Sequence, residues 1–269
     1  MLEADTATDL SADLAADLRL ITEAALAGGA IAMRYFRRNP DVWMKGGTSP
    51  VSEADLAVDE YLRATLMAAR PAYGWLSEET ADTPERLAAA RSFIVDPIDG
   101  TRAFIDGRDT WCVSVAVVEA GQPIAGVLAC PVSGELFQAT RGGKATLDGR
   151  PIRVRVAGEA PQIAGPKPMV DRARRVFPGL GTVSYVPSLA YRVAMVAAGR
   201  IDATFVKPNA HDWDLAAADL ILKQAGGGIL TPAGVAPRYG GADPRHGSLV
   251  AGSTFRLEKL SGVLAETAD

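Results

Sequence analysis

Two different patterns of apolar residues divide this chain of 269 residues, and together they constrain its fold more than any other feature. Between residues 92 and 157, short β-branched runs are separated by turns rich in glycine, proline and aspartate, which predicts a meander of strands. From residue 158 onward, strand-like and helix-like runs alternate, which favours a more parallel α/β layer. The stretch 157–168 contains three prolines and two glycines and is the expected boundary. We therefore predict an α+β domain at 1–157 with an antiparallel sheet, and an α/β domain at 158–269.

Two helices are expected before the meander. Apolar residues at spacings of three, four and seven predict a helix over 12–38 with Ser11 as its N-cap. Ser52 and Asp55 fit a capping box, so a second helix should begin there and stop before Pro71. The strands of the meander are expected at 92–95, 111–118, 123–130, 135–140 and 151–156; after it we expect strands at 183–186, 203–206 and 248–252 and helices at 189–199, 214–227 and 255–266.

Composition excludes several classes of function. The chain has 32 acidic and 28 basic residues and a net charge of −4, so no general attraction to nucleic acid or to an anionic membrane is expected. No run reaches the roughly 18 apolar residues of a membrane helix, and the acidic N-terminus does not resemble a secretory signal. The only two cysteines, Cys112 and Cys130, cannot form a disulfide framework, so we expect buried thiols in a cytoplasmic protein. With two histidines and no ATP-binding P-loop, catalysis should use carboxylates, hydroxyls or a metal ion.

The sharpest local feature is the sequence VDPIDGT at residues 95–101, in which an apolar strand leads into two acids, a glycine and a hydroxyl. Asp96 and Asp99 are three residues apart on a turn and can face one small volume. Pro97 stiffens their connection, and Gly100 permits a tight backbone whose next amides can bind an anion. Taken alone, this pattern is more often a strand-ending turn with solvated aspartates.

Three other acids have structural explanations of their own. Glu78 ends an apolar stretch and could be a surface charge. Asp214 lies at the start of an expected helix, where an aspartate often caps the backbone. Asp55 could serve only the capping box.

Taken together, these pieces resemble the inositol monophosphatase superfamily of magnesium-dependent, lithium-sensitive phosphatases. The resemblance rests on SPVSEAD at 49–55, SEE at 77–79, DPIDGT at 96–101 and WDLAA at 213–217, which stand in the family's order over nearly the whole chain. It implies a layered αβαβα sandwich of the inositol monophosphatase and sugar phosphatase type. The first half would hold a large antiparallel sheet and the second a smaller mixed sheet, with the site between the two halves.

The resemblance also implies a set of metal ligands. Glu78, Asp96 and the Ile98 carbonyl would hold a first Mg²⁺; Asp96, Asp99 and Asp214 would hold a second, with Asp96 shared between them. Oxygen ligands without histidine or cysteine suit a hard cation. Two or three Mg²⁺ ions and inhibition by Li⁺ are therefore expected.

Four further residues receive roles from the same resemblance. Thr101, paired with Asp55, would orient the attacking water and help to remove its proton, so that no phosphoenzyme forms. The amides of Gly100 and Thr101, at the start of a short helix, would bind phosphate oxygens. Lys45 matches a family lysine near the metal site, although it could equally be an exposed loop charge.

Substrate choice is less clearly encoded. Inositol phosphatases carry a glutamate about seven residues before the metal-binding aspartate, whereas this chain has Lys207 there, which favours a substrate with extra negative charge. Arg192 lies where bisphosphate nucleotidases often carry a lysine. We therefore expect a 3′(2′),5′-bisphosphate nucleotidase acting on adenosine 3′,5′-bisphosphate; inositol-1-phosphate and histidinol phosphate are the alternative substrates.

Some questions stay open at this level. A catalytically inactive nucleotide-binding relative is the alternative from another class, although the presence of all five acids and Thr101 argues against it. His211 lies close to Asp214, but the family mechanism does not need it, and His246 is expected in a surface loop. Family members are often homodimers, yet no apolar stripe indicates an interface. The expected partner is a small phosphorylated substrate, with neither a nucleic acid polymer nor a membrane.

Overall fold

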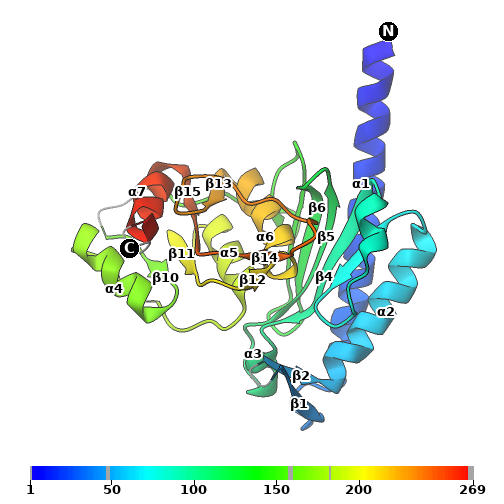
Figure 1. Ribbon diagram of the computed structural model, residues 1–269, viewed down its shortest axis with the longest axis horizontal. Helices are drawn as coiled ribbons and strands as arrows, with labels where there is room; N and C mark the ends of the chain where they lie inside the picture. The colour runs from blue at the N-terminus through cyan, green and yellow to red at the C-terminus, as the bar shows by residue number, and fades with distance from the viewer. Residues whose placement is uncertain (1, 47–48, 157–159, 182, 266–269) are drawn as a thin grey trace.

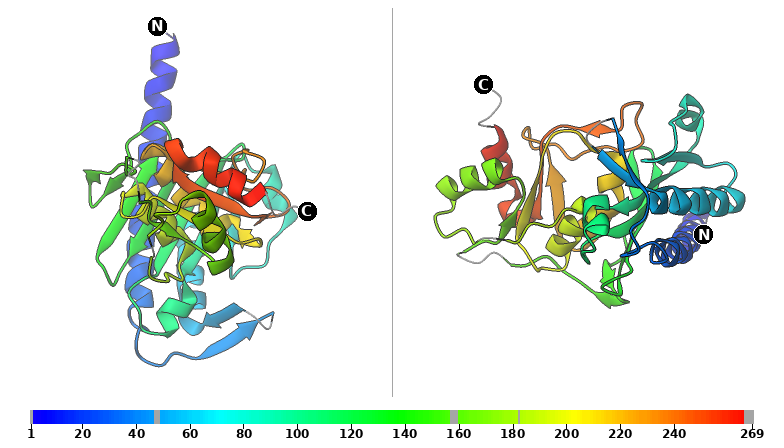
Figure 2. Two further views of the ribbon diagram at one scale, coloured as in Figure 1. Left: turned by 90° about the vertical axis from the view of Figure 1, so that its left-hand side faces the viewer. Right: turned by 90° about the horizontal axis from the view of Figure 1, so that it is seen from below.

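The fold is a stack of five layers, in which two sheets alternate with three layers of helices (Figure 1). The structure is a computed structural model that describes residues 2–46, 49–156, 160–181 and 183–265. Helices α1 and α2 pack on one face of a seven-stranded sheet and α5 and α6 on the other, while α5 and α6 also contact a four-stranded sheet whose far side is covered by α4 and α7 (Figures 1 and 2). This arrangement confirms the predicted αβαβα sandwich.

The first half of the chain supplies the large sheet, in the strand order β3-β4-β5-β6-β7-β8-β9. Its neighbours are antiparallel except for β3 and β4, which run parallel. The elements are α1 (Leu2–Ala32), β1 (Val42–Lys45), β2 (Ser49–Ser52), α2 (Glu53–Ala69), β3 (Gly74–Ser77), the 3₁₀ helix η1 (Pro84–Ala88), β4 (Arg91–Asp99), α3 (Thr101–Ile105), β5 (Cys112–Glu119), β6 (Gln122–Cys130), β7 (Glu135–Thr140), β8 (Thr146–Leu147) and β9 (Arg150–Pro151).

The second half supplies the small sheet, in the order β10-β11-β15-β13. Its elements are β10 (Ile163–Ala164), α4 (Lys167–Val176), α5 (Leu189–Ala197), β11 (Ala203–Val206), β12 (Ala210–His211), α6 (Asp212–Gln224), β13 (Gly227–Leu230), β14 (Arg245–His246), β15 (Leu249–Ser253) and α7 (Thr254–Ala265). Only β10 and β11 pair in parallel, so the sheet is mixed, as predicted, but the more parallel layer expected from the alternation is wrong. The division at 157 and 158 stays a prediction, and residues 157–159 lie outside the described ones.

Strands β5 and β6 are buried almost throughout because helices cover both faces of the large sheet. The helices reach the sheet closely where glycine removes a side chain. A Cβ on Gly126 of β6 would lie 3.0 Å from the carbonyl oxygen of Ala217 in α6. On the opposite face, a Cβ on Gly29 of α1 would lie 2.7 Å from Pro131. Helix α6, which carries Asp214, is therefore seated directly on the sheet.

Several sequence-based boundaries need correction. The first helix runs from Leu2 to Ala32, so it contains Ser11 instead of starting at it, and residues 33–37 form turns. Of the expected strand 151–156 only Pro151 pairs with another strand. Residues 183–186 form no strand with any of the described residues. The structure confirms the capping box at the start of α2 and the end of that helix before Pro71. It also confirms the three helices expected after residue 188. Of these, α5 ends at Ala197 and α6 at Gln224, and the helix expected at 255–266 is described only to Ala265.

None of the helices in the described ranges is both long enough and apolar enough to cross a membrane. Cys112 and Cys130 are buried free thiols on neighbouring strands of the large sheet, as expected.

Candidate active site

The parallel pairing of β3 and β4 brings the first acids together. Ser77 of β3 is opposite Val95 of β4, and the amide of Glu78 donates to the carbonyl of Val95 at 3.3 Å. Because parallel strands end at the same edge of a sheet, Glu78 and Asp96 emerge side by side. The ladder between β4 and β5 then shifts register between Asp96 and Asp99, at the position of a proline that cannot donate a hydrogen bond.

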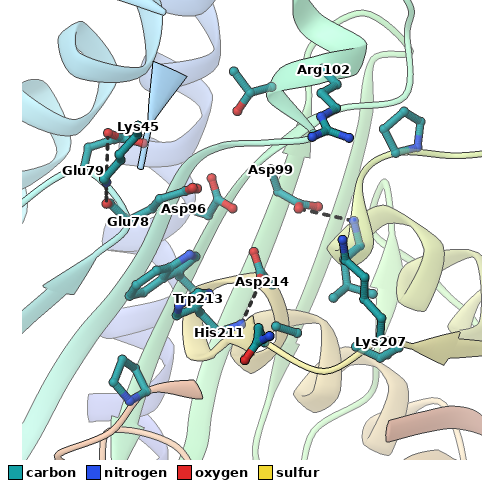
Figure 3. Close-up of a pocket in the computed structure, with 18 of the residues that line it drawn as sticks. Lys45, Glu78, Glu79, Asp96, Asp99, Arg102, Lys207, His211, Trp213 and Asp214 are labelled. Carbon is teal, nitrogen blue, oxygen red and sulfur yellow. Dashed lines mark hydrogen bonds and ion pairs between the residues drawn. The ribbon is translucent and has the colours of Figure 1, made fainter. Parts of the chain in front are cut away.

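Asp214 reaches the same place from the opposite side. It is the third residue of α6, and its carboxylate accepts the amide of His211 at 2.7 Å in a capping box, so His211 and not Asp214 is the N-cap residue. Carboxylate oxygens of Asp96, Asp99 and Asp214 lie within 4.8 Å of one another (Figure 3). The structure thus brings together acids from two layers of the fold.

Burial and mutual repulsion make this cluster costly without a cation. Burial holds the pKa of Asp96 well above its usual range, because it removes water from the charged form. Repulsion from neighbouring carboxylates raises this pKa further; in order of decreasing effect they are Glu78, Asp99, Asp214 and Asp55. The pKa of Glu78 is raised by burial first and by Asp214 next. Burial and the charge of Asp99 raise the pKa of Asp214 to about 7. Carboxylates that share so little water require protons or a positive ion, and an all-oxygen donor set fits Mg²⁺.

Asp99 is also tied to the N-terminus of α5. Its carboxylate accepts the hydroxyl of Ser188 and the amides of Leu189 at 3.2 Å and Ala190 at 2.7 Å. Ser188 caps the helix in turn by accepting the amide of Tyr191. Burial raises the pKa of Asp99, while these hydrogen bonds lower it. Ser188 was not among the sequence-predicted residues, although a serine before a helical pattern is the usual N-cap signal.

A hydroxyl and a carboxylate stand beside the acids. The Oγ1 of Thr101 lies 3.2 Å from the Oδ1 of Asp55 and 3.1 Å from the carbonyl oxygen of Ile98. The other oxygen of Asp55 accepts both the amide and the hydroxyl of Ser52, at 2.8 and 2.6 Å. Burial raises the pKa of Asp55 to about 6, against the effect of these bonds. Asp55 therefore serves the helix cap and faces Thr101 at the same time.

Gly100 has the backbone conformation that was expected of it. Its φ of +96° lies in the left-handed region, and a Cβ there would lie 2.9 Å from the Cβ of Ser188. It is the N-cap of α3, which begins at Thr101, so the predicted short helix is present. Whether the Gly100 and Thr101 amides bind phosphate is still a prediction.

A cleft of about 1270 Å³ opens above the acids, and the three predicted cationic residues line it. The Lys45 ammonium contacts the carbonyl oxygen of Glu78 and pairs with Glu79 at 3.3 Å (Figure 3). Arg192 donates to the carbonyl of Val186 at 2.8 Å, and burial lowers its pKa. Lys207 is exposed on the wall of the cleft, and no carboxylate in the described ranges lies within ion-pair distance of it.

The two histidines have structural surroundings that the sequence does not indicate. The rings of His211 and Trp213 stack with centroids 4.5 Å apart and form part of the cleft wall. His246 is not a simple surface-loop residue: its side chain is only 11% exposed, and its Nε2 lies 2.7 Å from the Oδ1 of Asp212. Its partner is 34 residues away in the sequence, so no local pattern could have indicated this pair.

Comparison with known proteins agrees with this geometry. The model of the inositol monophosphatase family matches residues 13–268. The chain is 33% identical over 260 residues to an inositol-1-monophosphatase of Rhizobium meliloti, covering 92% of this chain and 95% of that protein. It is 34% identical over 213 residues to a histidinol-phosphatase of Mycobacterium tuberculosis, covering 74% and 80%. The crystal structure of the extragenic suppressor protein suhB from Bartonella henselae superimposes with a TM-score of 0.82 at 29% identity, covering 94% and 99%.

The chain therefore belongs to the inositol monophosphatase family. Its enzymatic class is that of the phosphatases, which hydrolyse phosphate monoesters.

Proposed function

We propose that this protein hydrolyses a small phosphate monoester with the help of two or three Mg²⁺ ions held at the meeting point of β3, β4 and α6. The observation that carries the proposal is the approach of the Asp96, Asp99 and Asp214 carboxylates to within 4.8 Å of one another. Glu78 and the Ile98 carbonyl would complete the ligand set. Bound Mg²⁺ would supply Lewis acidity, which favours ionisation of a water and offsets charge on the phosphoryl and leaving oxygens.

The chain's own residues would then position the attacking water. A hydroxyl has one hydrogen, so Thr101 donates to either Asp55 or the Ile98 carbonyl, and the charged acceptor forms the stronger bond. Donation to Asp55 leaves the lone pairs of the Thr101 oxygen free to accept a hydrogen bond from water. Asp55 is held in place through Ser52, so the pair can orient a water; as Thr101 takes up the proton of that water, it passes its own hydroxyl proton to Asp55.

Hydrolysis assays test this proposal directly. Asp96→Asn should abolish Mg²⁺-dependent release of phosphate while leaving the fold intact, because Asp96 lies at the centre of the cluster. Asp219→Asn is the matched control: Asp219 is a buried acid of α6 that does not line the cleft, so this variant should keep its activity. Near-normal turnover by Asp96→Asn would overturn the proposal. Full metal occupancy without turnover on any of a panel of monoesters would instead indicate an inactive binding protein.

For the substrate we propose adenosine 3′,5′-bisphosphate, converted to AMP and phosphate. Support comes from the exposed ammonium of Lys207, which projects from the wall of the cleft and could meet a second phosphate. Arg192 adds a cationic charge to the same cleft. The relatives named inositol-1-monophosphatase and histidinol-phosphatase favour the second candidates, inositol-1-phosphate and histidinol phosphate.

A comparison of kcat/KM for the three esters separates these candidates. Lys207→Glu should lower kcat/KM for the bisphosphate by roughly 10-fold or more, since a hydrogen bond to a charged group contributes about 1.5–3 kcal/mol. The same variant should change kcat/KM for inositol-1-phosphate little or raise it. Equal kcat/KM values for all three esters in the wild type would leave Lys207 and Arg192 without a role in selection.

We also propose, from the family resemblance, a cytoplasmic location, inhibition by Li⁺ and a homodimer. The buried free thiols of Cys112 and Cys130 agree with a reducing compartment. Size-exclusion chromatography with light scattering tests the dimer, and titration of activity with LiCl tests the inhibition.

A further inference from the structure

The segment 239–246 forms hydrogen bonds with both halves of the chain. On the N-terminal side, the amide of Tyr239 donates to the carbonyl of Gly121 at 3.1 Å. The Arg86 guanidinium of η1 donates to the carbonyls of Gly240 at 2.9 Å and Gly241 at 2.7 Å. Arg86 is 5% exposed, and its guanidinium also pairs with the carboxylate of Asp82 at 2.5 Å.

In the second half of the chain, the same segment contacts the start of α6. The amide of Asp212 donates to the carbonyl of Pro244 at 2.9 Å, and β12 pairs with β14. The Asp212 carboxylate, which is 1% exposed, accepts the amide of Gly240 at 2.6 Å on one oxygen and faces the Nε2 of His246 at 2.7 Å on the other. The Tyr239 ring packs against His246 with centroids 5.4 Å apart. Asp212 is therefore held from two directions.

Asp212 lies two residues before Asp214 and directly after His211, whose amide donates to the Asp214 carboxylate. The first turn of α6 thus contains the anchored residue, the residue that orients Asp214, and Asp214 itself. A change in the attachment of Asp212 would rotate or shift this turn. Since Asp96 and Asp99 are on β4, such a shift would change the separation between acids that belong to different layers.

We propose that His246 is a positioning residue for the metal site: through Asp212 it fixes the first turn of α6, and so sets the distance of Asp214 from Asp96 and Asp99. This inference rests on the proposed function, because it takes Asp214 as a metal ligand. His246 does not line the cleft and makes no contact with the three acids in the described structure. It acts on them only through Asp212, as partners of metal ligands commonly do.

Two substitutions at this position separate the hydrogen bond from the packing. His246→Phe keeps a ring against Tyr239 but removes the nitrogen that faces Asp212. His246→Gln can place an amide N–H near the same carboxylate. Arg245→Ala is the matched control, because Arg245 is in the same segment, is exposed, and within the described part of the chain its side chain forms hydrogen bonds and an ion pair with Asp243 alone.

Binding of Mn²⁺, followed by the electron paramagnetic resonance signal of the free ion, reports on the site without turnover. His246→Phe should raise the dissociation constant for Mn²⁺ by roughly 10-fold or more. His246→Gln should stay within about threefold of the wild type, and Arg245→Ala should match it. Excess Mg²⁺ should restore kcat of His246→Phe with little change in KM, an outcome that general loss of structure would not give.

Wild-type affinity for Mn²⁺ in a folded His246→Phe variant would overturn the inference, as would equal weakening in the Phe and Gln variants. If His246→Phe lacks the far-UV circular dichroism of the wild type, Asp212→Asn tests the same contact. It keeps an acceptor for the Gly240 amide and should weaken Mn²⁺ binding by a similar factor; unchanged binding overturns the inference. Failure of the wild type to bind Mn²⁺ or to show Mg²⁺-dependent hydrolysis would instead refute the proposed function.

Discussion

Removing Mg²⁺ at neutral pH should destabilise the folded chain, and lowering the pH should restore part of that stability. Asp214 gives the scale of the effect. Its pKa rises from 3.8 to about 7, which is about three pKa units and, at about 1.4 kcal/mol per unit, corresponds to about 4 kcal/mol. An acid with a raised pKa binds its proton more tightly in the folded than in the unfolded chain. The free energy of unfolding of the metal-free protein should therefore fall as the pH rises from about 4 towards 7.

Urea unfolding at pH 5 and pH 7.5, with EDTA or with Mg²⁺, measures this effect. Asp214→Asn removes the titrating group, so between pH 5 and pH 7.5 the metal-free variant should lose less stability than the wild type, by about 2–3 kcal/mol. At pH 7.5, Mg²⁺ at 100 times its dissociation constant should stabilise the wild type by about 2.7 kcal/mol and the variant by less. Equal responses of both proteins to pH and to Mg²⁺ would refute the reasoning.

Three further outcomes are expected. Thr101→Ala should lower kcat by roughly 10²–10⁴-fold, the usual contribution of proton transfer, and Thr101→Ser should retain most of kcat in steady-state assays; an active Ala variant would contradict the role of the hydroxyl. Asp219, whose pKa burial raises to about 6, should destabilise the fold by about 3 kcal/mol above pH 6 but not below pH 4, so Asp219→Asn should remove that pH dependence in urea unfolding at constant Mg²⁺; an unchanged pH profile would contradict it. Gly126→Ala should lower the free energy of unfolding by about 1–3 kcal/mol, because its Cβ would meet the backbone of Ala217, whereas Gly247→Ala, with nothing within 4 Å, should not; equal thermal midpoints would contradict this.

The sequence predicts contacts correctly where the two interacting residues are close together in the chain. The box of Ser52 and Asp55 depends on residues three apart, and it forms as predicted. The turn that places Asp96 near Asp99 is likewise contained in seven residues. The meeting of these acids with Asp214 is not a local property, and it was anticipated only through the family resemblance.

The wrong strand assignments have a common cause. Residues 151–156 have alternating side chains, but the amide of Val154 donates to the carbonyl of Ala225 and no neighbouring strand continues the ladder. Residues 183–186 likewise lack a strand beside them, and the carbonyl of Val186 accepts Arg192 instead. A strand requires a neighbour, and a single sequence shows the pattern of the strand without showing its partner.

The same reasoning explains why the sequence predicts a surface loop for His246. Its burial depends on contact with Asp212, and the position of Asp212 depends on the packing of α6 on the large sheet. Two sets of hydrogen bonds around the site are not indicated by sequence patterns. One connects Asp99 with the start of α5, and the other connects Asp212 with the segment 239–246. In each case a carboxylate lies at the N-terminus of a helix from the second half of the chain: Asp99 faces the start of α5, and Asp212 is the first residue of α6. An ion held by Asp96, Asp99 and Asp214 would contact both layers at once, so we expect metal binding to be linked to closure of the two halves.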